Sequence, residues 1–286
     1  MLPGAQDSRP AVYDDCNRMM PKLPAVFATA SRRLMTHDGN KLGTRDVPEE
    51  TPIALTYDRT TYAVMMGTPA DIEDFAVGFS LTERIIEDID EIAELEIVTV
   101  PQGIEARMNL SSNRDVELVS RRRRLTGPAG CGLCGIESLE AAMAPLAHIE
   151  SSARISAGAI FRALGFMRDG QTLNAKTRGV HAAGFWSDDR LMALREDVGR
   201  HNALDKLAGA LAHAKLPAAS GILVMSSRLS IELVQKAAAI GCPIIVAVSA
   251  PTALALRAAD ESGMTVVAVA RDDSLEVFTH AERIGT

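Results

Sequence analysis

Residues 221–270 read GILVMSSRLSIELVQKAAAIGCPIIVAVSAPTALALRAADESGMTVVAVA, and this stretch decides the fold of the chain. Three short, almost wholly apolar runs alternate with two segments of helical spacing. In chain order these are a strand at 221–225, a helix at 229–239, a strand at 243–249, a helix at 251–262 and a strand at 264–270. Continuously apolar strands separated by helices are typical of a parallel sheet covered on both faces. The stretch therefore predicts an α/β fold with parallel crossovers.

Helix and strand signals also alternate upstream of this stretch, without an internal repeat or a low-complexity tract. The predicted elements are helices at 137–146, 156–164 and 198–213 and strands at 180–186 and 191–195. We therefore assign residues 136–286 to one α/β domain.

The chain before residue 127 predicts a smaller α+β domain over residues 23–126. Asp58-Arg59 separates two β-branched runs and predicts a hairpin. Thr68 precedes a proline and an acid, which predicts an N-cap with a helix directly after it. The predicted elements are strands at 52–57, 60–66, 95–100 and 104–110 and a helix after Thr68.

The composition narrows the class of protein. The chain has 286 residues, 30 basic and 37 acidic side chains and a net charge of −7, which argues against a non-specific nucleic-acid binder. Its apolar runs are too short for a membrane span, and residues 1–22 read as a flexible leader without a secretory apolar region. Four unevenly spaced cysteines are too few for a disulfide framework. These features predict a soluble, cytoplasmic protein.

The sequence GCGLCG at 130–135 carries the strongest chemical signal, within a mobile, glycine-rich loop expected over residues 127–135. A helix is predicted directly after the loop, and its N-terminus favours a thiolate at Cys134. Four arginines at 121–124 also favour a thiolate there if they fold back toward the cysteines. Cys131 and Cys134 are therefore candidates for sulfur or disulfide chemistry.

Other interpretations of this cysteine pair remain open. It is compatible with half of a zinc site, although Cys16 and Cys242 offer no second pair at metal-ligand spacing. It is also compatible with a thioredoxin-like redox pair, although the one tryptophan is remote. Zinc-dependent deamination is excluded, because the required His-x-Glu is absent: the corresponding histidine lies in His181-Ala182-Ala183.

A second constellation, REDVGRHNALDK at 195–206, combines acids, bases and a histidine. Asp197 is expected to cap a helix that places His201 and Asp205 one turn apart on one face. The simplest interpretation is a capped surface helix with ion pairs. The functional interpretation is a polar cluster at a strand–helix junction, where α/β folds bind ligands.

A third constellation, Ser226-Ser227-Arg228, follows a predicted strand and precedes a helix. Hydroxyls, free amides and an arginine at a helix N-terminus suit a phosphate, although serines there are also common as simple caps. The segment 271–274 reads as a solvated turn when taken alone. Cys242 begins an apolar strand and is expected in the core.

These segments together resemble the FdhD/NarQ family, the formate dehydrogenase accessory sulfurtransferases. They cover most of the chain from about residue 50. The matching stretches are AVGF (76–79), LTE (81–83), GCGLCG (130–135), EDVGRH (196–201), ALDK (203–206), SSR (226–228), ELVQK (232–236), AVSAPT (247–252) and VFTH (277–280).

The resemblance implies a three-layer C-terminal domain similar to cytidine deaminases but without zinc or another structural metal, plus the small N-terminal domain. It implies a carrier-type sulfurtransferase that accepts persulfide sulfur from a cysteine desulfurase. The sulfur then passes to the molybdenum bis(guanine dinucleotide) cofactor, the bound substrate, before its insertion into the formate dehydrogenase apoenzyme. Neither nucleic acid nor membrane is an implied partner, and a homodimer is compatible with this picture.

The resemblance also assigns roles to residues. It implies that Cys131 carries the persulfide, with Cys134 either releasing the sulfur by forming a disulfide or assisting. The implied cofactor-binding stretch is Val269, Ala270, Arg271, Asp272, Asp273 and Ser274. We expect His201, Ser226, Ser227 and Arg228 to line the same cavity. The family commonly has a second glycine before Val-His, where this chain has Arg178. The alternatives are a cofactor-binding chaperone without sulfur transfer and a dithiol oxidoreductase.

Overall fold

The computed structural model describes residues 22–111, 146–271 and 273–285. The expected leader at 1–22 (apart from its last residue), the cysteine loop at 127–135 and the predicted helix at 137–146 (apart from its last residue) fall outside these ranges. The strands are β1 (Phe27–Thr36), β2 (Gly39–Pro48), β3 (Thr51–Tyr57), β4 (Thr60–Gly67), β5 (Ile92–Val100), β6 (Gly103–Leu110), β7 (Ile155–Ser156), β8 (His181–Ser187), β9 (Arg190–Asp197), β10 (Ile222–Met225), β11 (Ile244–Ala247), β12 (Thr265–Ala268), β13 (Glu276–Val277) and β14 (Ile284–Gly285). The α-helices are α1 (Ile72–Thr82), α4 (Ala157–Gly170), α5 (Thr172–Thr177), α6 (Arg200–His213), α7 (Ile231–Ala239) and α8 (Ala253–Glu261).

The larger sheet has six strands in the order β13-β12-β11-β10-β8-β9. Its centre is parallel, as predicted: Leu223 pairs with Ile245, and Ile245 pairs with Val266. The outer strands β8, β9 and β13 are antiparallel to their neighbours, so the sheet is mixed. The predicted α/β fold class is thus confirmed.

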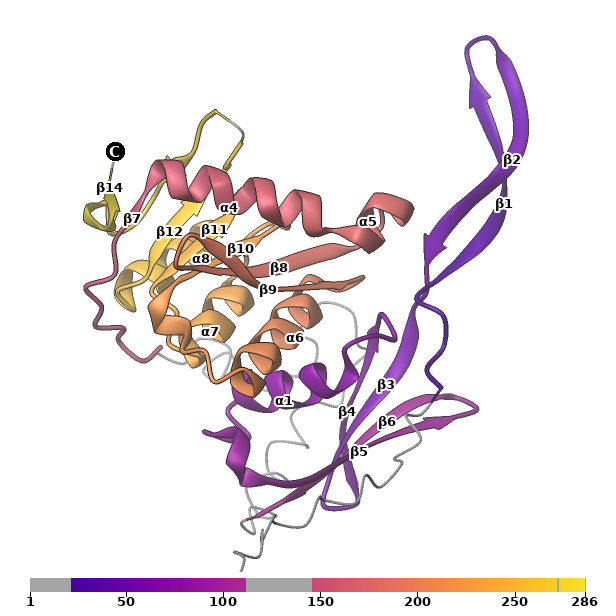
Figure 1. Ribbon diagram of the computed structural model, residues 1–286, viewed down its shortest axis with the longest axis horizontal. Helices are drawn as coiled ribbons and strands as arrows, with labels where there is room; N and C mark the ends of the chain where they lie inside the picture. Colours follow the sequence, from indigo (N-terminus) through magenta and orange to yellow (C-terminus); the bar gives the residue numbers. More distant parts are fainter. Residues whose placement is uncertain (1–21, 112–145, 272, 286) are drawn as a thin grey trace, which may run out of the picture.

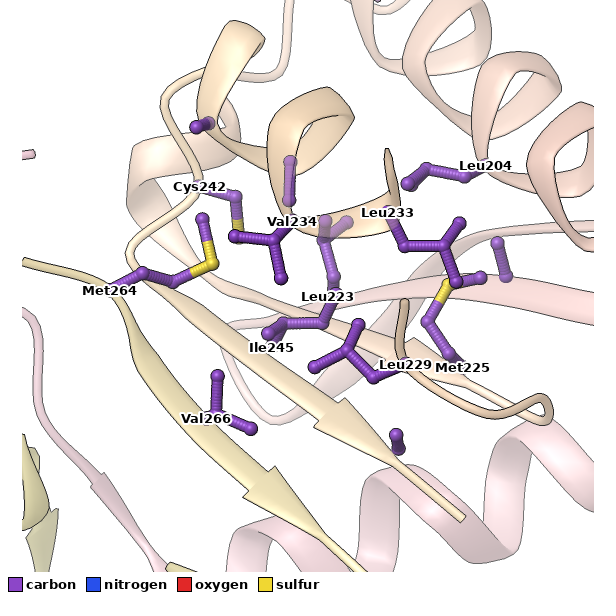
Figure 2. Close-up of a cluster of buried hydrophobic side chains, with 14 of the residues drawn as sticks. Leu204, Leu223, Met225, Leu229, Leu233, Val234, Cys242, Ile245, Met264 and Val266 are labelled. Atoms are coloured by element: carbon purple, nitrogen blue, oxygen red, sulfur yellow. The ribbon is translucent and has the colours of Figure 1, made fainter. Parts of the chain in front are cut away.

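Helices cover both faces of this sheet (Figure 1). On one face, α4 packs against the sheet through a core that includes Leu164, Trp186 and Val246. On the other face, α6, α7 and α8 enclose a second core that includes Leu204 and Leu233. Figure 2 shows part of this second core, where side chains of β10, β11 and β12 meet those of α7. Burial on both faces explains why these strands read as continuous apolar runs.

The N-terminal part forms a four-stranded sheet of order β4-β3-β6-β5, packed against α1. The predicted hairpin is confirmed as β3–β4, which pair antiparallel. Helix α1 in turn packs on α6, and the two helices touch backbone to backbone. A Cβ atom on Gly78 would lie 1.7 Å from the carbonyl oxygen of Asp205, and one on Gly209 would lie 1.9 Å from that of Asp74. Only glycine permits this approach.

The long hairpin β1–β2 projects from the body (Figure 1), and no specific signal in the sequence predicts it. Most of its residues are exposed on both faces, so no apolar and polar alternation marks them. Its base rests on α5: the Arg45 guanidinium donates to the carbonyl of Thr177 (3.1 Å), and the Lys176 ammonium lies 5.1 Å from the ring centroid of Phe27.

Two predicted helix caps are wrong. Thr68 does not cap α1, which begins at Ile72 after Asp71, a residue with φ of 53° and no side-chain capping bond. Asp197 does not occupy the N-cap of α6 either, because Gly199 does. Both residues are fully buried and contact each other instead, as described below.

In the part of the chain that the structure describes, no helix is long and apolar enough to cross a membrane.

Candidate functional site

The candidate site lies along the edge of the large sheet where its parallel strands end. The connections leaving β10, β11 and β12 carry Ser226–Arg228, Val248–Ala250 and Val269–Arg271, and α6, α7 and α8 begin near this edge. Parallel strands in open α/β sheets place ligands at their carboxyl ends, next to helix N-termini. Three of the predicted segments therefore converge on one edge.

Ser226 is fixed at this edge by the antiparallel neighbour β8. Its hydroxyl oxygen accepts a hydrogen bond from the amide of Ala182 (2.8 Å), and its own amide donates to the carbonyl of Ala182 (3.0 Å). The next hydroxyl, that of Ser227, donates to the carbonyl of Arg228 (3.0 Å). Both serines thus shape the turn, while the Arg228 side chain is exposed.

A cavity of about 570 Å³ opens between this edge and α4. Its volume is typical of small-molecule sites. The apolar lining residues are Leu164, Met167, Val248 and Ala270, and the polar ones are Arg168, Gln171, Ser226, Arg271 and Asp273. Of the twelve residues predicted for the site, Ser226, Ala270, Arg271 and Asp273 line this cavity. His201, Ser227 and Arg228 are not among its lining residues.

The predicted cofactor-binding stretch begins with a strained residue. Val269 has φ of 51°, a left-handed conformation that is rare for a β-branched side chain. The stretch is held by neighbouring backbone: the amide of Ala270 donates to the carbonyl of Ala247 (3.3 Å), and that of Arg271 donates to Ser274 (2.7 Å). The Arg271 guanidinium donates to the carbonyls of Val248 and Ala270. Such strain marks a backbone position that is fixed by its surroundings, as at many ligand sites.

Several buried polar atoms at this edge have no hydrogen-bond partner among the described residues. In the cavity wall this is the amide nitrogen of Gln171, whose side chain is 8% exposed. On the α6 and α7 side they are Nε of Arg200, Nε2 of His201, Oγ of Ser230 and Oε2 of Glu232. Unpartnered buried polar atoms are rare in folded proteins and often mark a site for a ligand or water.

His201 and Glu232 face each other across the N-termini of α6 and α7. Nε2 of His201 lies 3.8 Å from Oε2 of Glu232. Burial acts to raise the pKa of Glu232, but the adjacent His201 and Ser230 outweigh it and hold that pKa at about 2. The Glu232 carboxylate is therefore ionised at neutral pH.

The same edge is rich in positive charge. Burial lowers the pKa of His181, and the nearby Arg200, His201 and Arg228 lower it further, while Asp197 opposes them. His181 is therefore neutral at pH 7. A cluster of cationic groups next to helix N-termini favours anionic ligands.

Other residues of the 195–206 segment join the two halves of the chain. The Lys206 ammonium lies 2.7 Å from Oδ2 of Asp197, and both side chains are fully buried. The same carboxylate accepts hydrogen bonds from the amides of Thr68 (2.9 Å) and Gly199 (2.7 Å). The Asn202 amide donates to this carboxylate as well (3.0 Å). The interpretation of a capped surface helix is therefore wrong, because α6 is buried from His201 to Leu211.

A second buried network ties α6 and α7 to α1. The Lys236 ammonium lies 2.9 Å from Oδ1 of Asp205 and 2.7 Å from Oε1 of Glu83. The Thr82 hydroxyl donates to Asp205 (2.6 Å). Burial raises the pKa of Asp205 despite the counteracting Lys236 and Thr82. Lys236 and Asp205 therefore act in packing the two halves together.

The remaining predicted residues are placed as follows. Cys131, Cys134 and Asp272 fall outside the described ranges. Cys242 is fully buried in the core, as predicted, and burial raises the pKa of its thiol to about 12. Within the described ranges no group of three or more histidine, cysteine, aspartate or glutamate side chains is arranged to hold a metal ion.

Two residues of interest, Arg168 and Gln171, carry no signal in the sequence. Arg168 and Gln171 lie at the end of α4 and enter the cavity wall because that helix crosses the sheet edge, which no local pattern reveals. Arg178 ends α5 with φ of 54°, a left-handed conformation that favours glycine. Arg178 already stands out in the sequence, because a glycine is common at this position before Val180-His181 in the resembling family.

Comparisons with known proteins agree with this architecture. A model of the FdhD/NarQ family matches residues 48–285. Relatives named sulfur carrier protein FdhD include those of Agrobacterium fabrum, 48% identical over 92% of this chain and 97% of the relative, and Brucella abortus, 49% identical over 86% and 92%. The relative of that name from Xanthomonas campestris is 41% identical over 92% of this chain and 95% of the relative.

A solved structure from Desulfotalea psychrophila, described as a formate dehydrogenase accessory protein, superposes with a TM-score of 0.71. It is 27% identical and covers 91% of this chain and 100% of its own. The family model spans most of the chain, and the relatives match over nearly their whole length. The chain belongs to the FdhD/NarQ family.

Proposed function

We propose that this chain is a sulfur carrier that serves formate dehydrogenase. It accepts the outer sulfur of a cysteine desulfurase persulfide on Cys131. It then delivers that sulfur to the molybdenum bis(guanine dinucleotide) cofactor, bound as substrate, before the cofactor enters the apoenzyme. The names of the relatives support the carrier role, and their similarity extends over most of the chain.

The observation that carries the proposal is the cavity at the carboxyl edge of the sheet. It combines an apolar wall with Arg168, Arg271 and Ser226, and the strained residue Val269 directly precedes Ala270 in its lining. Guanidinium groups bind phosphates through charge-assisted, often bidentate hydrogen bonds. A phosphate-bearing, partly apolar substrate of the dinucleotide type suits this set of groups.

The sulfur steps need no external oxidant, and the one reductant they require is a cellular thiol. The Cys131 thiolate attacks the outer sulfur of the desulfurase persulfide, forming a new S–S bond and releasing the desulfurase thiolate. The persulfide on Cys131 then holds sulfur at the sulfane level. When the Cys134 thiol attacks Cys131, a disulfide forms between the two and the outer sulfur leaves as hydrosulfide with its electron pair. A cellular thiol must then reduce this disulfide before the next cycle.

The test is mass spectrometry of the full chain after incubation with a cysteine desulfurase and cysteine. We expect the wild type to gain the mass of sulfur and Cys131→Ala to lose that gain. Cys134→Ala should accept sulfur but hold it longer, because the disulfide that expels it cannot form. The matched controls are Cys16→Ala and Cys242→Ala, which should accept sulfur as the wild type does.

Two results would contradict the proposal. One is sulfur loading that survives the double variant Cys131→Ala/Cys134→Ala. The other is a double variant that still activates formate dehydrogenase, which would indicate a cofactor chaperone that transfers no sulfur.

A further inference from the structure

Three unsatisfied polar atoms lie apart from the cavity, where helices α6 and α7 begin. They are Nε2 of His201, Oγ of Ser230 and Oε2 of Glu232, all buried and without a hydrogen-bond partner among the described residues. His201 as a whole is only 8% exposed. The atoms do not satisfy one another, since Nε2 of His201 and Oε2 of Glu232 are 3.8 Å apart, beyond hydrogen-bonding distance. A ligand that both accepts and donates hydrogen bonds would satisfy them.

The two helices leave their N-terminal amides without side-chain caps. The N-cap of α6 is Gly199, which has no side chain, and the N-cap of α7 is Ser230, whose hydroxyl makes no capping bond. Helix α8 begins at the same edge but is capped by Thr252, whose hydroxyl oxygen accepts from the amide of Ala255 (3.2 Å). Free amides and helix dipoles therefore favour negative charge where α6 and α7 begin.

The charges around these atoms favour an anion that carries a hydrogen. Burial lowers the pKa of His181, and the nearby Arg200 and Arg228 lower it further, so positive charge accumulates here. The Glu232 carboxylate is ionised at neutral pH and opposes this charge. Its unpartnered oxygen repels a bare anion but accepts a hydrogen bond from an anion with a hydrogen to donate. The ligand that fits is therefore a small anion of this kind.

We propose that His201, Ser230 and Glu232 form a binding site for hydrosulfide (HS⁻). The sulfur accepts from Nε2 of His201 and from the hydroxyl of Ser230, and the S–H group donates to Oε2 of Glu232. Hydrosulfide is the form in which the sulfur leaves when Cys134 attacks the persulfide on Cys131. The site holds this sulfur within the chain until it reaches the cofactor. The inference rests on the proposed function and deepens it, because it assigns the residues that retain the released sulfur.

The test is calorimetric titration of the full, reduced chain with sodium sulfide, and with sodium azide for comparison, at about pH 8 without oxygen. We expect the wild type to bind one hydrosulfide. His201→Leu should bind it at least about tenfold more weakly, because a hydrogen bond to a charged ligand is lost. His201→Gln, whose amide nitrogen lies near the position of Nε2, should recover part of this loss.

Glu232→Gln tests for the hydrogen of the ligand. Azide has no hydrogen to donate, so it should bind more tightly once the negative charge of Glu232 is removed. Hydrosulfide instead exchanges a charged acceptor for a weaker, neutral one. The ratio of hydrosulfide to azide affinity should therefore fall by about tenfold. A gain of azide binding cannot arise from misfolding.

The matched controls are His148→Leu and Glu261→Gln at exposed positions, which should bind both anions as the wild type does. Absence of hydrosulfide binding by the wild type at millimolar sulfide would overturn the inference, as would an unchanged ratio of the two affinities in Glu232→Gln. If the chain loads sulfur from a desulfurase but does not bind hydrosulfide, the retention site fails and the carrier function stands. If it binds hydrosulfide but gains no sulfur on Cys131, the carrier function fails and the anion site stands.

Discussion

The buried polar residues between α1 and α6 differ from those at the sheet edge in how their hydrogen bonds are satisfied. At the α1–α6 interface, Asp197 and Lys206 pair with each other and with surrounding backbone. At the sheet edge, Gln171 and His201 are also buried, yet one side-chain nitrogen of each has no hydrogen-bond partner among the described residues. Satisfied groups hold a fold together, whereas unsatisfied ones cost stability and persist where a ligand completes them.

The largest effect is expected from breaking the satisfied interface. Lys206→Met leaves the buried Asp197 carboxylate without its cation, so the free energy of unfolding should fall by about 3–5 kcal/mol. Denaturant unfolding at neutral pH measures this loss. Lys41→Met, an exposed change on β2, is the control and should alter stability by less than about 0.5 kcal/mol. A loss below about 1 kcal/mol in Lys206→Met would show that the pair does not stabilise the interface.

Replacing Glu232 at the sheet edge is expected to have an intermediate effect on stability, and this effect depends on pH. Its folded pKa of about 2 lies below the ordinary value of 4.5, so its ionised form stabilises the folded state above pH 4.5. That contribution is lost as the pH falls from 4.5 towards 2. Glu232→Gln should therefore be about 1–2 kcal/mol less stable at pH 7, once solvent screening is allowed for.

Unfolding curves between pH 7 and pH 2 check this prediction, since the difference between Glu232→Gln and the wild type should shrink on acidification. Glu261→Gln, an exposed change at the end of α8, should follow the wild type at every pH. A constant difference across this range would argue that His201 and Ser230 do not hold the Glu232 carboxylate in its ionised form.

The smallest effect is expected at Gln171. Because its amide nitrogen makes no hydrogen bond in the described structure, Gln171→Met should leave the free energy of unfolding unchanged or raise it by up to about 1 kcal/mol. The matched variant is Asn202→Leu at the interface, where the amide donates to Met66 (2.8 Å) and Asp197 (3.0 Å). That variant should lose about 1–3 kcal/mol. Thermal or denaturant unfolding measures both variants. Equal losses of unfolding free energy in Gln171→Met and Asn202→Leu would show that the sheet edge and the interface do not differ in hydrogen-bond satisfaction.

Much of the larger sheet follows from local sequence. The apolar runs that became β10, β11 and β12 are buried on both faces, so their composition alone reveals them. The hairpin β1–β2 is exposed along most of its length, so burial does not require apolar side chains there and its composition does not reveal it. The family itself was predicted from spaced motifs and is confirmed by the match over residues 48–285.

The roles of motif residues were harder to predict, because long-range contacts decide them. Thr68 looks like a cap locally, yet it bonds to Asp197, 129 positions later in the chain. Residues of the 195–206 segment have different roles for the same reason. His201 faces α7 at the sheet edge, while Lys206 faces the N-terminal half of the chain. Gln171 carries no local signal, since its role depends on where α4 ends relative to the sheet.

The two glycine contacts between α1 and α6 have a consequence for movement during the reaction. With Gly78 against Asp205 and Gly209 against Asp74, the two helix backbones meet directly at these points, so sliding or rotating one helix on the other would bring backbone atoms into collision. These contacts therefore resist relative movement of the small and large sheets at this seam. We expect the movements that admit or release cargo to be local ones, of a turn or a side chain.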